Sequence, residues 1–130
     1  MKKILIVLRL IILMIVSACD LNENHFVGTW QYSEYSEEWN PYPPPEFLSG
    51  TTVYTVIFSE DMHLTFLMEL YIGGVWDGGL GMSGTYDYTD TELMVTCSGM
   101  PDVIMTYSFS ADYESLTIYE DGIPMTFARQ

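Results

Sequence analysis

The regular strand pattern of this sequence begins at Phe26-Val27-Gly28-Thr29-Trp30. In an extended chain neighbouring side chains point to opposite faces, so Phe26, Gly28, Trp30 and Tyr32 would share one face. We expect this stretch to be the first strand of a small closed β-barrel. In such a barrel seven further strands curl round until the last one, which ends at Arg129, lies beside the first.

The chain after this strand keeps a period of two nearly everywhere, which is the pattern of β-strands. Short runs of turn-forming residues, such as Asp121-Gly122, separate the strands, so neighbours should pair antiparallel in a meander. Closure is expected because it removes both exposed edges of the sheet. We therefore predict an all-β domain over residues 26–130, an eight-stranded antiparallel up-and-down barrel. The seven strands after the first are expected at about 51–58, 63–72, 82–88, 93–97, 103–109, 116–118 and 123–129.

Residues 1–18 have the layout of a secretory signal peptide. A basic start, Met1-Lys2-Lys3, is followed by a mostly apolar run over residues 4–16 that is too short to span a bilayer. The run ends in Val16-Ser17-Ala18-Cys19, which resembles the lipobox of bacterial lipoproteins. That resemblance implies cleavage before Cys19 and its acylation, for example with palmitate. An ordinary signal peptide followed by a coincidental cysteine is the alternative.

An acylated Cys19 would anchor the protein, because two or more acyl chains hold a protein firmly on a membrane. Residues 19–25 would then form a short tether between the membrane and the barrel. This interpretation predicts a membrane-anchored lipoprotein of the bacterial cell envelope that faces the periplasm or the cell exterior.

The charge balance argues against several partners. The chain has 18 acidic residues and four basic ones, and its formal net charge is −14. Removal of residues 1–18 would leave Arg129 as the one basic residue. Nucleic acid is not an expected partner, because phosphate binding needs a basic face. Attraction to anionic headgroups is not expected for the same reason.

The two cysteines of the chain leave no pair for an internal disulfide, because Cys19 would be acylated. We expect Cys97 to be a buried apolar thiol in a strand. A reactive thiolate needs basic or histidine neighbours, and this sequence has almost none.

Patterns of catalytic and metal-binding residues are missing. His25 and His63 are the only histidines, which makes a catalytic triad or a zinc site implausible. Asp87, Asp90 and Glu92 surround one turn and could offer oxygens to calcium, but they lack the spacing of an EF-hand loop. A solvated acidic turn is the preferred interpretation. We expect no enzymatic activity, no metal and no cofactor.

Gly28-Thr29-Trp30 resembles the Gly-x-Trp motif of the lipocalin superfamily. In that superfamily an arginine from the end of the barrel packs across the tryptophan, and Arg129 is placed to do so. A guanidinium over an indole face contributes about 0.5–2 kcal/mol. The resemblance implies a compact lipocalin-like domain of the kind found in bacterial lipoproteins, with Gly28, Trp30 and Arg129 in structural roles. The chain departs from a typical lipocalin in being shorter and in lacking a C-terminal helix.

Alternate connections of an up-and-down barrel gather at one end, and two of these are long and aromatic. We expect the connections at about 36–50 and 73–81 to be loops at the barrel mouth. Inward-facing tyrosines would lie below them, and their hydroxyls need hydrogen-bond partners. These aromatic residues either hold a ligand or partner, or fold over and plug their own barrel. The predicted ligand-binding residues are Trp39, Tyr42, Phe47 and Trp76 in the connections and Tyr54, Tyr86 and Tyr107 inside the barrel.

Two functions remain open on this evidence. The first is a lipid-anchored binding protein of the cell envelope that holds a small apolar ligand or an envelope component at the mouth of its barrel. The second is a protein-interaction or surface-structural lipoprotein with a filled barrel. A cavity would favour the first, and a packed interior with exposed Trp39 and Trp76 would favour the second.

Overall fold

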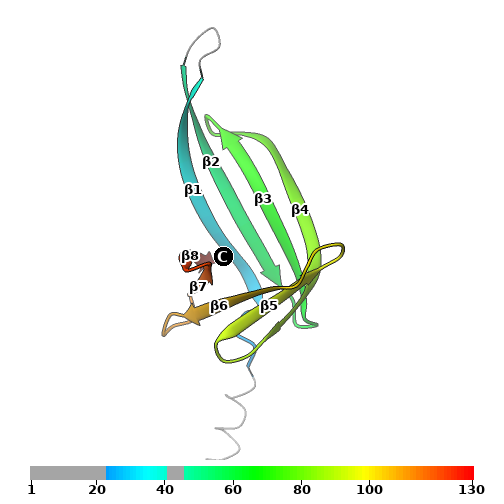
Figure 1. The fold of residues 1–130 in the computed structure, drawn as a ribbon. Coiled ribbons are helices and arrows are strands. Elements are labelled where there is room, and N and C mark those ends of the chain that lie inside the picture. The colour runs from blue at the N-terminus through cyan, green and yellow to red at the C-terminus, as the bar shows by residue number, and fades with distance from the viewer. Residues whose placement is uncertain (1–22, 41–45) are drawn as a thin grey trace, which may run out of the picture.

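The protein is a closed antiparallel barrel in which eight strands pair in chain order (Figure 1). Its structure, a computed structural model, describes residues 23–40 and 46–130. The predicted all-β, eight-stranded up-and-down barrel is confirmed. The strands are β1 (Gly28–Asn40), β2 (Glu46–Phe58), β3 (His63–Ile72), β4 (Val75–Tyr88), β5 (Glu92–Cys97), β6 (Val103–Phe109), β7 (Ser115–Glu120) and β8 (Ile123–Arg129).

Several predicted features fall outside this description. The signal peptide, Cys19 and Tyr42 lie outside the described residues, and so do the side chains of Trp39 and Phe47. Within the described residues, no helix is long and apolar enough to cross a membrane.

The barrel has strands of two lengths. Strand β8 pairs with β1 only at Trp30 and Gln31, and β5 pairs with β4 only from Gly84 onward. Strands β1–β4 continue as a four-stranded sheet well beyond the short strands β5–β8 (Figure 1). We call this extension the wall, and define it as residues 32–40, 46–54, 68–72 and 75–80. The wall therefore rises over one side of the barrel.

The predicted loops at about 36–50 and 73–81 are wrong, because most of their residues continue the strands. Gly73 and Gly74 have φ angles of 58° and 80°, which form a two-residue hairpin turn that most other residues would resist. The ladder resumes at once, with Ile72 opposite Val75. The pattern of period two fades here because both faces of the wall meet solvent, so neither face needs to be apolar.

The other end of the molecule holds the most buried residues. We call it the closed end, and it carries the β2–β3, β4–β5 and β6–β7 turns at residues 59–62, 89–91 and 110–114. Phe26, which precedes β1, is 1% exposed, and Trp30 is fully buried. Residues 24–130 contain all eight strands and this core, so a piece that begins at residue 20 includes a complete folding unit.

Candidate functional site

An apolar cavity of about 530 Å³ opens into the barrel. Every one of the eight strands contributes to its lining. Most lining side chains are aliphatic, aromatic or methionine, and methionine adapts its shape to irregular surfaces. The apolar lining includes Val56, Phe58, Leu64, Phe66, Met82, Leu93, Val95, Met105, Ile118, Met125 and Phe127.

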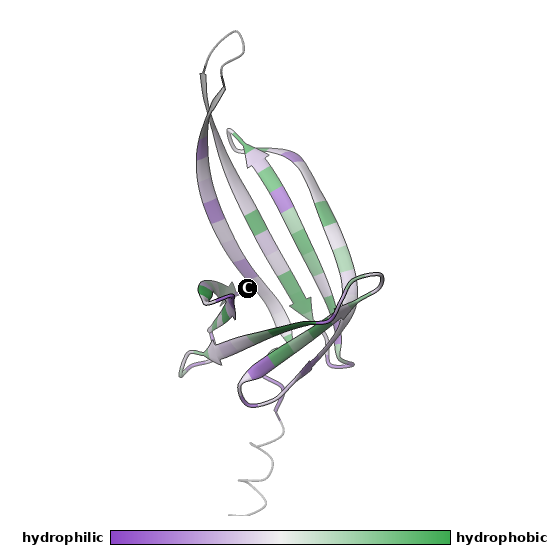
Figure 2. Cartoon of the chain, in the orientation of Figure 1, coloured by the Kyte–Doolittle hydropathy of each residue, from purple (hydrophilic) through white to green (hydrophobic). Residues whose placement is uncertain are grey.

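The cavity opens at the end opposite the closed end, which we call the mouth. Its rim includes Met100 and Pro101 in the β5–β6 turn, and Ile123 and Pro124 beside the β7–β8 turn. The wall stands over the opposite side of this opening (Figure 1). Figure 2 shows hydrophobic positions along β2 and β3 and hydrophilic bands along β1. The mouth is thus framed by short turns on one side and by a tall sheet on the other.

The closed end is filled by aromatic side chains. The ring of Phe26 lies between four aromatic rings from three strands, β2, β4 and β6, with centroid distances of 4.7 Å to Tyr107 and 4.9 Å to Phe109. It also lies 5.2 Å from Phe58 and 5.1 Å from Tyr88. Such offset and edge-on arrangements add to the stabilisation by burial. We call Phe26 and its aromatic neighbours the aromatic plug, and it closes the barrel opposite the mouth.

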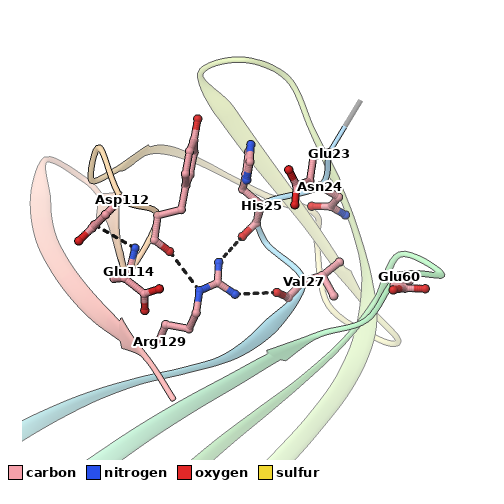
Figure 3. Close-up of a pocket in the computed structure, with 9 residues that line it drawn as sticks. Glu23, Asn24, His25, Val27, Glu60, Asp112, Glu114 and Arg129 are labelled. Carbon is pink, nitrogen blue, oxygen red and sulfur yellow. Dashed lines mark hydrogen bonds between the residues drawn. The ribbon is translucent and has the colours of Figure 1, made fainter. Parts of the chain in front are cut away.

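Arg129 stabilises this end of the barrel from its outer side (Figure 3). Its guanidinium carbon lies 4.3 Å from the centroid of the Trp30 ring, so the predicted contact between them is confirmed. The guanidinium donates to three backbone carbonyls: Nε to Tyr113 at 3.1 Å, Nη1 to Val27 at 2.9 Å and Nη2 to His25 at 3.0 Å. One side chain thereby joins β8, the β6–β7 turn and the segment before β1.

Gly28 explains why this arrangement needs the Gly-x-Trp spacing. Its φ angle is 137°, and a Cβ atom placed there would lie 2.8 Å from Nη1 of Arg129. A side chain at residue 28 would therefore displace the guanidinium from Val27 and from the indole of Trp30.

A shallow acidic surface surrounds Arg129 at the closed end. It is lined by carboxylates from the N-terminal segment and from two turns, among them Glu23, Glu60, Asp112 and Glu114 (Figure 3). Within residues 23–40 and 46–130 no group of three or more His, Cys, Asp or Glu residues is arranged to hold a metal ion. Asp112 accepts from Ser110 and from the backbone of Glu114, which holds its pKa below the ordinary value. These contacts order the β6–β7 turn.

The predicted ligand-binding tyrosines are divided between the two ends. Tyr54 lines the cavity. Tyr86 and Tyr107 do not, and they belong to the closed end. The Tyr86 hydroxyl donates to the carbonyl of Ser59 at 2.8 Å and accepts from Nδ2 of Asn24 at 2.8 Å, and the Tyr107 hydroxyl donates to the carbonyl of Thr89. All three have the inward orientation expected from the sequence. The hydroxyls of Tyr86 and Tyr107, however, have hydrogen-bond partners within the protein, and these two residues do not line the cavity.

Trp76 lies on β4 at the far part of the wall. Its side chain is 58% exposed and does not line the cavity. It stands opposite Tyr71 in the β3–β4 ladder. The expected convergence of Trp76 with Trp39 over the mouth stays a prediction, because the side chain of Trp39 lies outside the described residues. Residue 76 itself is in a strand and not in a loop. A binding role for Trp76 stays a prediction.

The lining residues that sequence reasoning did not assign to the site are mainly aliphatic and aromatic, and they also include methionines and two carboxylates. Met82, Met105 and Met125 have inward parity in their strands, but parity does not say how far along the barrel a residue lies. Glu34 and Glu120 also line the cavity. Cys97, which we expected to be a buried thiol, lies in β5 as predicted but is only half-buried, and it lines the cavity as well.

Burial raises the pKa of Tyr86 and of Tyr107, so the folded state holds these phenol protons more tightly than the unfolded state does. The resulting stability is complete below the unfolded value of about 10 and is lost as pH rises through the raised folded values. We expect the free energy of unfolding, measured with urea, to fall as the pH rises above about 10. The decline should be shallower in the Tyr86→Phe/Tyr107→Phe variant.

Tyr35→Phe is the control for this titration, because Tyr35 is 66% exposed. It should decline like the unmodified protein. An equal decline in all three proteins would show that the closed-end tyrosines do not set the alkaline limit.

Comparison of the chain with protein-family models, with curated proteins and with solved structures found no match. The site is therefore interpreted from its own geometry.

Proposed function

We propose that this protein is a non-enzymatic, lipid-anchored binding protein of the bacterial cell envelope that holds a small apolar ligand in its barrel. The observation that carries the proposal is the cavity of about 530 Å³, which is lined mostly by apolar side chains and open at the mouth. Binding sites for small molecules are usually apolar hollows of about 300–1,000 Å³ with few polar groups.

The arrangement of the two ends supports the same proposal. The aromatic plug and the three hydrogen bonds of Arg129 make the closed end rigid. Residue 23 enters the barrel beside that end (Figure 3). An anchor at Cys19 would be separated from it by only a few residues, and each extended residue spans at most about 3.6 Å. Under this proposal the mouth faces away from the membrane.

The decisive measurement is ligand retention by residues 20–130 purified gently from the host. We expect native mass spectrometry to find an apolar compound bound to the barrel. We also expect the stripped protein to bind Nile red, an uncharged apolar dye whose fluorescence rises in apolar surroundings. In Val95→Trp a large side chain occupies the cavity, and this variant should lose at least tenfold in dye affinity.

Ile57→Trp is the matched control, because Ile57 is an exposed apolar residue that does not line the cavity. It should bind Nile red like the unmodified protein. A barrel that carries no compound and binds no dye would reject the proposed function. Equal binding by the two tryptophan variants would place the dye outside the cavity.

A second candidate function is protein interaction, and the free edge of the wall favours it. In the described part of the chain, no strand pairs with β4 on its outer side before Gly84. Val75, Trp76 and Leu80 along this edge are 70%, 58% and 50% exposed. An exposed edge with few charges is a template for the addition of another strand. A native mass spectrum that shows a bound protein and an empty cavity would favour this second function.

A further inference from the structure

The charges that line the cavity have one sign. Among the described residues, Glu34 and Glu120 are the only ones in its lining with a formal charge at neutral pH. The single basic residue after residue 18, Arg129, lies at the closed end, where it already donates to three carbonyls. An anionic head group at the mouth would therefore find no cation and would face two carboxylates.

These carboxylates occupy inward positions, which general acidity of the surface does not explain. Glu34 follows the inward residues Trp30 and Tyr32 at the spacing of two that places side chains on one face of a strand. Glu120 follows Leu116 and Ile118 in the same way. Glu34 lies beyond the last β1–β8 pair, and Glu120 ends β7 beside the β7–β8 turn. Both residues are exposed, so they lie at the mouth and not in the apolar interior.

Aromatic rings lie beside one of these carboxylates. The rings of Tyr32 and Tyr54 are stacked, with 5.8 Å between their centroids, and both line the cavity. Burial raises the pKa of Tyr54, and the negative charge of Glu34 raises it further, so the field of this carboxylate reaches the hydroxyl. Aromatic faces together with carboxylates are the groups that bind ammonium ions, whose charge is attracted to both.

We propose that the cavity selects amphiphiles with a cationic head, whose apolar tail enters the barrel while the head lies among Glu34, Glu120 and the Tyr32–Tyr54 pair. This inference rests on the proposed function, since it names the class of ligand for the same cavity. It separates that class from anionic lipids such as fatty acids, which an apolar barrel alone would also accept.

Three ligands with ten-carbon chains test the proposal: decyltrimethylammonium, decyl maltoside and decanoate. Each is added to residues 20–130 carrying Nile red, at low ionic strength and below its micelle-forming concentration, and the displacement of dye is measured. We expect decyltrimethylammonium to bind at least tenfold more tightly than decanoate. The preference should shrink as salt is added, because exposed charges are screened within about 10 Å at 0.1 M salt.

Two charge variants locate the source of the preference. In the Glu34→Gln/Glu120→Gln variant the affinities for decyltrimethylammonium and decanoate should differ by no more than about threefold, because the local Coulomb attraction is gone. The affinity of this variant for decyl maltoside should be unchanged. Glu60→Gln/Glu114→Gln changes the net charge equally but at the closed end (Figure 3). This control should keep the preference for the cation.

The outcomes distinguish this inference from the function on which it rests. Dye binding with equal affinity for the cation and for decanoate would overturn the cation preference and leave the apolar binding site standing. An equal loss of preference in both charge variants would also overturn it, because the net charge would then be the cause. Failure of Nile red and of all three ligands to bind would reject both.

Discussion

Replacement of Arg129 by alanine should lower the free energy of unfolding by about 2–4 kcal/mol. The variant loses the contact with the Trp30 ring at 4.3 Å and three hydrogen bonds to backbone carbonyls. The effect should be large because β1 and β8 pair at only two positions, so this side chain supports the weakest seam of the barrel. Denaturant unfolding followed by tryptophan fluorescence measures it.

Two further variants separate charge from geometry at this seam. Arg129→Lys keeps the charge but not the fork of donors, and should recover less than half of the loss. Gly28→Ala should destabilise the unmodified protein by about 1–3 kcal/mol through the crowding of Arg129. Its cost should fall in the Arg129→Ala background, where Nη1 is absent.

The neighbouring residue Gln130, which is exposed, provides the control. Gln130→Ala should change stability by no more than about 0.5 kcal/mol. A loss below about 1 kcal/mol in Arg129→Ala would show that the seam holds without the guanidinium.

Replacement of Phe26 by alanine should cost about 3–5 kcal/mol, the usual range for a buried phenylalanine. Phe26 is 1% exposed and its ring lies within about 5 Å of four other rings, so its removal leaves a hole in the aromatic plug. Thermal and denaturant unfolding measure the loss. Nile red binding to the folded variant would also show whether the barrel then opens at both ends.

Tyr35→Ala is the matched control for Phe26→Ala, because Tyr35 is an aromatic residue of β1 that is 66% exposed. It should alter stability by no more than about 0.5 kcal/mol. Similar losses in the two variants would mean that the plug contributes little beyond the area of one aromatic ring.

The two ends of the barrel have different roles under the proposed function. The closed end holds the most buried side chains and the hydrogen bonds that join distant segments, so it keeps the barrel shut. The cavity, which opens at the mouth, is lined by four methionines, the paired tyrosines and the two carboxylates. Stability and ligand selection are therefore separable, and variants at one end should leave the other unchanged.

The order of the strands and the faces of their side chains could be predicted from the amino-acid sequence alone. Its period of two is a local property of the extended chain, so it placed Trp30, Tyr54, Tyr86 and Tyr107 inside before any contact was known. The closing contact was also predictable, because Arg129 ends the last strand of a meander whose first strand carries Trp30. Turn residues located most strand ends in the second half of the chain for the same local reason.

The position of each residue along the barrel axis could not be predicted in this way, because it depends on the pairing of distant strands. The alternation of side chains shows which face of a strand a residue lies on, but not its position along the barrel axis. The sequence therefore did not reveal that Tyr86 and Tyr107 belong to the closed end while Tyr54 lines the cavity. The wall could not be predicted from the sequence either. The short strands β5–β8 do not cover it, so its residues need no apolar face and show no clear alternation. Where the neighbouring strands stop depends on pairing between distant segments, and that pairing determined the mouth, the cavity and the place of Glu34 and Glu120.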